Sequence, residues 1–282
     1  MIEKFETKLK NYLFLAFIIA CLCGCEPQKV TWVAIGDSIT YLNDHQDETG
    51  HRLEKGYMTR LCEKYPNVDY INQGHNGWTA IGIAENIEDL GLVEADVYTV
   101  FLGTNDWWQG KPVGTMADYE NNTGTGTSSG SFRIIVDKLK SLNKGAQIIL
   151  ITPMQRGDFV YVNDYSNNAF GSYKAKNGQT LEEFANLVTW IGKKENFPVV
   201  DLYHNSGITD EKAVHFKRLK DPETGQYKKF IYPDYVDLPF DPENDEYPYP
   251  EDAIYMTYDG LHPSDEGCEI IADMIIEKWE GL

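Results

Sequence analysis

Short apolar, strand-like runs alternate with amphipathic helical patterns along most of this chain, and this alternation limits the possible fold more than any other feature. The runs cover residues 30–35, 68–72, 97–102, 147–151 and 198–202, and the helical patterns cover residues 57–65, 80–90, 132–142, 181–194 and 264–279. Nearly continuous apolar strands are typical of sheets that are covered on both faces. The pattern therefore predicts a doubly wound α/β fold with a five-stranded parallel sheet.

Composition excludes several classes of protein. The 282 residues are 42% hydrophobic and 24% charged, which is too apolar for a disordered chain. Five cysteines are too few for a disulfide scaffold. A net charge of −19 argues against nucleic acid as a partner, because such binding depends on Lys and Arg, and it disfavours docking to anionic lipid.

The N-terminus has the pattern of an export signal. Residues 12–23 are apolar without a break and would span only about 18 Å as a helix, which is short for a membrane span. The segment ends in Leu22-Cys23-Gly24-Cys25, which resembles a bacterial lipobox. This resemblance implies a lipoprotein signal peptide over residues 1–24, with cleavage after Gly24 and lipid attached to Cys25. The alternative is an ordinary signal peptide with incidental cysteines.

Residues 25–282 show no internal repeat and no flexible linker, so we expect a single domain. Two segments interrupt the alternation: residues 109–130 are expected to form a long polar loop, and residues 203–258 an aromatic-rich insertion. Thr180 and Glu183 predict a capping box for the fourth helix. Cys62 and Cys268 either pair or remain separate thiols.

Four motifs with chemical potential lie where strands end or the last helix begins. Ligands of doubly wound sheets bind beyond the carboxyl ends of the strands, so these positions matter most. The first motif, Gly36-Asp37-Ser38, would present a serine hydroxyl at the edge of the sheet. The second, residues 72–77, contains glycines that allow a backbone N–H to approach a ligand. His75 in this segment is interpreted as a polar loop residue.

The third and fourth motifs supply an amide and an Asp–His pair. Asn105, in the segment 103–106, offers a side-chain donor for a developing oxyanion. In Asp259-Gly260-Leu261-His262 the carboxylate can hold one imidazole nitrogen and leave the other to accept a proton from a serine. Each motif taken alone is ordinary turn chemistry.

Taken together, the four motifs and their order resemble the SGNH (GDSL-type) hydrolase family, from about residue 30 to the last helix. The resemblance implies a three-layer α/β/α, flavodoxin-like sandwich. It also implies a serine esterase in which Ser38 is the nucleophile, His262 the general base and Asp259 the residue that orients His262. The implied oxyanion hole consists of the Ser38 N–H, the Gly77 N–H (preferred over Gly74) and the Asn105 amide. The Gly-x-Ser-x-Gly sequence at residues 126–130 lies in the expected polar loop and not after a strand, so it does not predict a nucleophile elbow. No dinucleotide motif or P-loop is present, and we expect neither a cofactor nor a metal.

The substrate is less constrained than the chemistry, because the fold does not select it. Trp78, Trp107 and Trp108 follow two of the motifs and are expected to flank the serine, with the insertion forming one wall of the cleft. Flat aromatic faces suit sugar rings, so we expect hydrolysis of short-chain, acetyl esters on a carbohydrate. The alternatives are a lysophospholipase or lipase, and a glycan-binding lipoprotein without catalysis.

By analogy with surface lipoproteins of this fold, we expect an exported protein, lipid-anchored to the bacterial outer membrane, whose only membrane contact is the anchor. The oligomeric state is left open.

Overall fold

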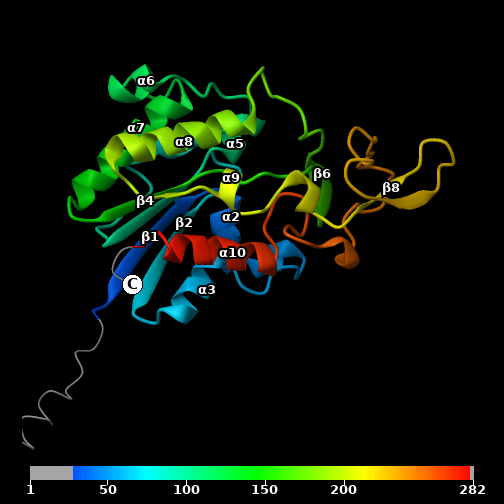
Figure 1. The fold of residues 1–282 in the computed structure, drawn as a ribbon, viewed down its shortest axis with the longest axis horizontal. Coiled ribbons are helices and arrows are strands. Elements are labelled where there is room, and N and C mark those ends of the chain that lie inside the picture. Colours follow the sequence, from blue (N-terminus) through cyan, green and yellow to red (C-terminus); the bar gives the residue numbers. More distant parts are fainter. Residues whose placement is uncertain (1–27, 280–282) are drawn as a thin grey trace, which may run out of the picture.

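The computed structural model describes residues 28–279, which surround a five-stranded parallel sheet. Its strands are β1 (Val30–Gly36), β2 (Val68–Gly74), β3 (Val97–Phe101), β4 (Gln147–Ile151) and β7 (Val199–Val200), in the spatial order β2-β1-β3-β4-β7. All five lie where the sequence predicts them, although β7 is only two residues long. The predicted three-layer α/β/α sandwich with a five-stranded parallel sheet is confirmed (Figure 1).

Helices cover both faces of the sheet (Figure 1). On one face α3 (Tyr57–Lys64) and α10 (Asp265–Ile276) pack against Trp32 and Ala34 of β1. On the other face α4 (Ala80–Glu85), α7 (Ser128–Leu142) and α8 (Leu181–Glu195) pack with Val33 and Ile35. Alternate residues of a strand face opposite sides of its sheet, and all four of these β1 side chains are fully buried. Because helices cover both faces of the sheet, every side chain in this part of β1 is buried, which explains its unbroken apolar run.

Helix boundaries follow local capping. The predicted capping box of α8 is present: Thr180 accepts from the Glu183 N–H, and the Thr180 N–H donates to the Glu183 carboxylate. The expectation that residues 109–130 form a long polar loop needs correction, because two helices lie partly or wholly within this range. A second capping box, formed by Thr115 and Asp118, starts the short helix α6 (Met116–Glu120) there. The Thr127 side chain then caps α7, so this helix begins before residue 132.

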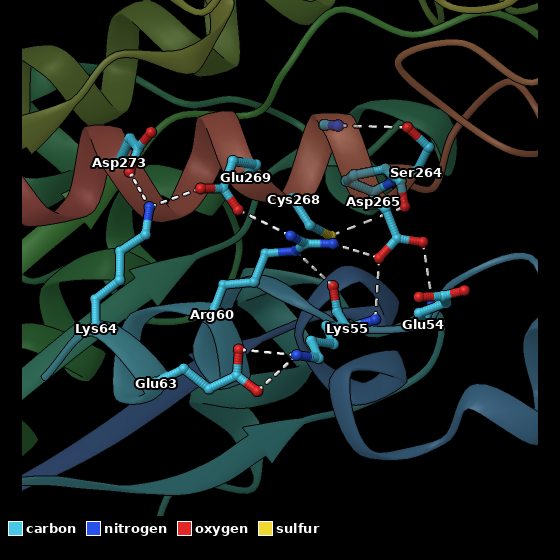
Figure 2. Close-up of polar contacts among 12 residues, drawn as sticks. Glu54, Lys55, Arg60, Glu63, Lys64, Ser264, Asp265, Cys268, Glu269 and Asp273 are labelled. Atoms are coloured by element: carbon cyan, nitrogen blue, oxygen red, sulfur yellow. Dashed lines mark hydrogen bonds and ion pairs between the residues drawn. The ribbon is translucent and has the colours of Figure 1, made fainter. Parts of the chain in front are cut away.

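Ion pairs join α10 to α3 (Figure 2). Arg60 of α3 contacts both Asp265 and Glu269 of α10, and Lys64 contacts Glu269 and Asp273. The Asp265 carboxylate also accepts hydrogen bonds from the backbone N–H groups of residues 54 and 55. Because α10 begins three residues after His262, these contacts fix the segment that carries this histidine.

Two antiparallel hairpins lie outside the central sheet (Figure 1). The first joins β5 (Phe159–Tyr161) to β6 (Asp164–Ala169), and the second joins β8 (Lys217–Lys220) to β9 (Tyr227–Phe230) within the 203–258 insertion. An aromatic cluster packs the insertion onto the first hairpin, through contacts that include Val160 and Tyr249. The remaining short helices are α2 (Ser38–Tyr41), α5 (Thr104–Trp108), α9 (Leu202–Asn205) and four 3₁₀ turns, Leu42–Asp44, Gln46–Thr49, Asp210–Lys212 and Glu251–Ala253.

The predicted signal peptide and Cys25 lie outside the described residues. Between residues 28 and 279, no helix has both the length and the apolar character required to cross a bilayer. Cys62 is half-buried and Cys268 is buried, and both are free thiols. Of the two alternatives for these cysteines, the structure therefore supports the second: they are separate thiols and do not pair.

Candidate active site

Ser38 lies where β1 ends and α2 begins. The preceding residue, Asp37, caps α2 by accepting a hydrogen bond from the Ile39 N–H at 3.0 Å. This cap places Ser38 in the first turn of the helix, where a backbone N–H has no partner within the helix. The strand end and the cap together fix both the hydroxyl and the N–H of Ser38 at the carboxyl edge of the sheet.

Asp259 and His262 lie in one tight turn before α10. One carboxylate oxygen of Asp259 accepts from the N–H groups of Leu261 and His262, at 3.0 and 2.7 Å. The turn requires glycine at position 260, because φ is +89° there and a Cβ would lie 1.8 Å from the Asp158 carbonyl oxygen. The Asp259 carboxylate is thus held by the backbone before it contacts the imidazole.

The structure brings Ser38, His262 and Asp259 into one hydrogen-bonded chain. His262 Nδ1 lies 2.7 Å from Asp259 Oδ2, and His262 Nε2 lies 2.8 Å from Ser38 Oγ. A carboxylate only accepts hydrogen bonds, so the Nδ1 proton points to Asp259 and Nε2 is left to accept the hydroxyl proton of Ser38. The imidazole also contacts Phe159 edge-on, with ring centroids 5.1 Å apart.

Three candidate hydrogen-bond donors belong to residues that line the same cavity as Ser38. They are the backbone N–H groups of Ser38 and Gly77 and the side-chain amide of Asn105; Ser38, Gly77 and Asn105 all line the same cavity. Neither backbone N–H has an acceptor within residues 28–279. The Asn105 amide donates to the Trp78 carbonyl at 3.0 Å, and its second contact, with Asp37, is long at 3.5 Å. One amide proton of Asn105 is therefore weakly bound.

The geometry favours Gly77 over Gly74 as the second backbone donor. Gly74 is the last residue of β2, and its N–H already donates to the Asn72 side chain at 2.9 Å. A Cβ on Gly74 would lie 2.1 Å from the Tyr41 nitrogen, so its surroundings are closed. Gly77 has a φ of +73° and borders open space.

Two buried carboxylates hold these motifs together. Asp106 accepts hydrogen bonds from the Ala80 N–H at 2.8 Å and the Ser128 hydroxyl at 2.7 Å, which joins α5 to α4 and α7. Burial raises the pKa of Asp106 and raises the pKa of Asp37 from 3.8 to about 6. Both side chains therefore act as braces that hold neighbouring segments in place.

Ser38 and His262 open into a cavity of about 460 Å³, called here the Ser38 cavity. Several lining residues carry carboxamides, which suit hydroxyl-rich ligands: Asn76, Asn105, Gln109, Asn167 and Asn168. Other parts of the lining are aromatic or aliphatic, namely Leu42, Trp108, Phe159, Tyr161, Tyr258 and Leu261. In the part of the chain that the structure describes, no cluster of three or more His, Cys, Asp or Glu residues has the arrangement of a metal site.

The prediction that three tryptophans flank the serine needs correction. Only Trp108 lines the Ser38 cavity. Trp107 is buried and its indole N–H donates to the Gln179 carbonyl at 3.1 Å. Trp78 packs on the α4 side of the sheet and stacks on His75, with ring centroids 4.6 Å apart. Successive helix residues point about 100° apart, so neighbours such as Trp107 and Trp108 face different surroundings.

The expected role of the insertion also needs correction. The wall of the cavity is formed mainly by the first hairpin, including Phe159, Tyr161 and Asn168. The insertion contributes Tyr258 to the lining and otherwise packs against this hairpin. The Tyr247 hydroxyl, for example, donates to the Val160 carbonyl at 3.0 Å. Sequence reasoning missed this hairpin and also missed Arg156, a buried lining residue after β4. The rule that ligands bind at strand ends, applied to the fourth strand, would have indicated this segment.

Comparison with known proteins finds solved structures that are similar to this chain. The crystal structure of a possible lipase from Chitinophaga pinensis is 63% identical, covers 88% of this chain and 97% of that chain, and superposes with a TM-score of 0.87. An acetyl xylan esterase, AlAXEase, has 19% identity and a TM-score of 0.53, with 88% and 98% of the two chains covered. A catalytic mutant of an acetylxylan esterase from Geobacillus stearothermophilus has 18% identity and a TM-score of 0.51, with 89% and 94% covered.

These last two similarities concern the fold alone, because sequence identity is low. No curated protein sequence matches the chain. The model of the GDSL-like lipase/acylhydrolase family, in contrast, matches residues 34–270, a span that contains all four motifs. The chain therefore belongs to the GDSL-like lipase/acylhydrolase family.

Proposed function

We propose that this protein is a carboxylic ester hydrolase (the EC 3.1.1 class) that uses Ser38, His262 and Asp259 as a catalytic triad. The observation that carries the proposal is the hydrogen-bonded chain, in which His262 Nε2 lies 2.8 Å from Ser38 Oγ and Nδ1 lies 2.7 Å from Asp259. A nucleophile within reach of a base that a third group orients is the arrangement used for acyl transfer. Membership of an acylhydrolase family supports the same chemistry.

In the acylation step Ser38 Oγ forms a bond to the ester carbonyl carbon while its proton passes to His262 Nε2. The tetrahedral intermediate collapses, the bond to the alcohol oxygen breaks, and the His262 proton goes to the leaving alcohol. A water molecule then attacks the acyl-enzyme, with His262 again as base, and releases the acid and free Ser38. Asp259 stabilises the imidazolium formed in each half-reaction.

The oxyanion of both tetrahedral intermediates is expected to bind the Ser38 N–H, the Gly77 N–H and the Asn105 amide. These donors come from the segments that follow β1, β2 and β3, which are neighbours in the sheet. They are fixed before the substrate binds, so little reorganisation is needed when charge develops on the oxygen. Losing one such donor typically costs about 10²–10³ in kcat.

The substrate proposed is a short-chain, acetyl ester of a carbohydrate. The 460 Å³ cavity has a lining rich in carboxamides and one tryptophan, a combination that suits a sugar bearing a small acyl group. Two structures with a similar fold are named as acetylxylan esterases, which is consistent with this choice. The second candidate is a lipase-type acyl hydrolase, favoured by the name of the 63% identical Chitinophaga protein.

The test uses p-nitrophenyl esters of increasing chain length and acetylated oligosaccharides, with wild-type protein and Ser38→Ala. We expect turnover of the acetyl ester that declines with chain length, and no turnover by a folded Ser38→Ala protein. Hydrolysis of long-chain or phospholipid substrates alone would instead favour the lipase. A wild-type protein that binds glycans without hydrolysing any ester would favour a glycan-binding lipoprotein.

We also propose that the protein is exported and attached to the outer membrane of a bacterium through lipid on Cys25. Support comes from the apolar segment and the Leu-Cys-Gly-Cys sequence alone. Incorporation of a radiolabelled fatty acid into the full-length protein, compared with Cys25→Ala, tests the anchor. Label in both proteins, or in neither, would contradict it.

A further inference from the structure

Arg156 is a buried cation beside the proposed catalytic serine. It follows β4, lines the Ser38 cavity and is only 3% exposed. Burying a guanidinium is costly unless it is paired and hydrogen-bonded, and buried arginines normally face a carboxylate. Within residues 28–279, however, no Asp or Glu oxygen lies within ion-pair distance of Arg156. The two groups that accept hydrogen bonds from its guanidinium, a backbone carbonyl and a serine hydroxyl, are uncharged.

Most of the hydrogen-bonding capacity of Arg156 is unused. Nε donates to the Gly157 carbonyl at 3.2 Å, and Nη2 donates to the Ser172 hydroxyl at 3.2 Å. A guanidinium has five N–H groups, so three remain without an acceptor in the described part of the chain. Two neighbouring carboxylates are engaged elsewhere: Asp158 pairs with Lys217, and Asp259 with His262. Asp37 and Asp210 also interact electrostatically with Arg156, but both lie beyond ion-pair distance.

At least one of the unused donors, at Nη1, is not fully buried, and Arg156 lines two hollows that a ligand can enter. The buried, unpartnered side-chain atoms of residues 28–279 are His75 Nε2, Tyr173 Oη and Thr189 Oγ1. Nη1 of Arg156 also has no hydrogen-bond partner, but it is not one of these buried atoms. It therefore keeps some surface that solvent can reach. Arg156 lies between the Ser38 cavity and a smaller hollow of about 190 Å³, and it shares the former with Ser38 and His262.

A second cation, Lys176, lies close to Arg156 and near the same tryptophan ring. The Arg156 guanidinium lies 5.6 Å from the ring centroid of Trp108, and Lys176 Nζ lies 3.9 Å from the same centroid. Lys176 donates to the Gly171 carbonyl and has no carboxylate within ion-pair distance among the described residues. Burial and then the nearby Arg156 charge lower the pKa of Lys176, although Asp158 opposes this shift.

We propose that Arg156 receives a carboxylate on the alcohol part of the substrate, so that the preferred substrate is an acyl ester of an acidic sugar of the uronic-acid type. Planar guanidinium groups bind carboxylates through two parallel, charge-assisted hydrogen bonds. An acetyl group has no carboxylate, so the anion must belong to the alcohol. The chain's net charge of −19 opposes long-range attraction of polyanions, and the proposal therefore concerns one carboxylate held at short range. It rests on the esterase function proposed above.

The test compares two matched substrates, an O-acetylated methyl glucuronoside and the corresponding O-acetylated methyl glucoside. For wild-type protein we expect kcat/KM to favour the acid by about 10-fold or more, mainly through KM, because charge-assisted hydrogen bonds bind the ground state. Free glucuronate should also inhibit p-nitrophenyl acetate hydrolysis at lower concentration than glucose does. This comparison needs no variant, so it holds even if Arg156 substitutions fail to fold.

Variants assign the preference to Arg156. In Arg156→Met the acid-to-neutral ratio should fall close to one, whatever happens to the absolute rates. In the control Lys174→Met, which removes an exposed cation paired with Asp237, the ratio should stay as in wild type. A wild-type protein without preference for the acid, or a folded Arg156→Met that keeps it, would overturn the proposal. Failure of the esterase function itself would be recognised separately, as no hydrolysis of p-nitrophenyl acetate by wild type.

Discussion

The side-chain amide of Asn105 donates a hydrogen bond to the backbone carbonyl of Trp78 at 3.0 Å. This contact joins the segment after β3 to the segment after β2, across the end of β1 where Ser38 lies. It orients the amide so that its nitrogen, and not its oxygen, can act together with the Ser38 and Gly77 N–H groups as a proposed donor. The same contact holds the loop that carries Gly77. Asn105 is therefore placed to supply one of the proposed oxyanion donors and to position another.

Asn105→Ala should lower kcat for an activated acetyl ester by about 10²–10³ with a smaller change in KM, because the lost interaction is strongest with the oxyanion. Asn76→Ala is the matched control: Asn76 lines the same cavity, but its amide contacts Glu48 at 3.4 Å. We expect only a few-fold effect in the control. If Asn105→Ala kept the kcat of wild type, Asn105 would not be part of the oxyanion hole.

His262→Ala should impair the enzyme more than Asp259→Asn. Alanine removes the base altogether, whereas asparagine keeps an oxygen that can accept from the backbone N–H groups of Leu261 and His262. Asparagine also places an NH₂ group opposite Nδ1 and so favours the wrong tautomer of the imidazole. In other serine hydrolases the corresponding losses in kcat are about 10⁶ and 10⁴.

Steady-state rates of both variants, together with their thermal unfolding, check this order. A loss as large in Asp259→Asn as in His262→Ala, accompanied by a lower unfolding temperature, would show that Asp259 is indispensable for the shape of the turn. The expected order would then be wrong.

The sheet and the chemical motifs could be predicted from the sequence because both depend on local patterns. A strand buried on both faces must be apolar throughout, as β1 is from Trp32 to Ile35. Parallel strands end at a common edge, so residues after β1, β2 and β3 converge although they are far apart in the chain. The segment around Ser38 and the turn at His262 are separated by 224 residues and still meet.

The cavity wall could not be predicted, because it depends on tertiary contacts. Strand β6 has the sequence DYSNNA, which has no apolar alternation, and Ala169 is its only fully buried residue. The hairpin is held instead by distant groups such as the Tyr247 hydroxyl. Trp107 and Trp108 are likewise indistinguishable by sequence, and only the packing of α5 against α8 decides that Trp107 is the buried one.

Asp37→Asn should alter the pH dependence of stability. The pKa of Asp37 is raised to about 6, mainly by burial, so between about pH 4 and pH 6 the native state binds a proton that the unfolded state releases. The wild-type free energy of unfolding therefore decreases as pH rises through this window. The ionised carboxylate costs on the order of 3 kcal/mol at pH 7. Asparagine does not titrate and keeps the cap on Ile39.

The stability of Asp37→Asn relative to wild type should thus increase from pH 4 to pH 7, as measured by urea unfolding. Asp118→Asn gives the opposite sign, because hydrogen bonds from Thr115 lower the pKa of that exposed carboxyl. This control should lose relative stability as pH rises, by a smaller amount. A pH-independent difference between Asp37→Asn and wild type would contradict the assignment.

Lys217 and Asp158 form an ion pair inside the aromatic cluster, with both side chains essentially inaccessible to solvent and 2.7 Å between Nζ and Oδ2. Burial lowers the pKa of Lys217 to about 8, although Asp158 opposes this shift. Lys217→Met leaves the carboxylate buried without its partner, which typically costs about 3–5 kcal/mol. Because Asp158 directly precedes β5, the loss should also raise KM by loosening the cavity wall.

The double variant Asp158→Asn/Lys217→Met separates a charge effect from a packing effect. Asparagine keeps an oxygen for the Ser172 N–H, which donates to Asp158 at 2.6 Å, and removes the unpaired charge. We therefore expect the double variant to be more stable than Lys217→Met alone in urea unfolding, with KM returning toward wild type. The single variant Asp158→Asn completes the comparison. If the effects of Asp158→Asn and Lys217→Met simply add in the double variant, the charge is not the cause, and the packing of Lys217 against Phe170, Tyr173 and Tyr235 is what holds the hairpin in place.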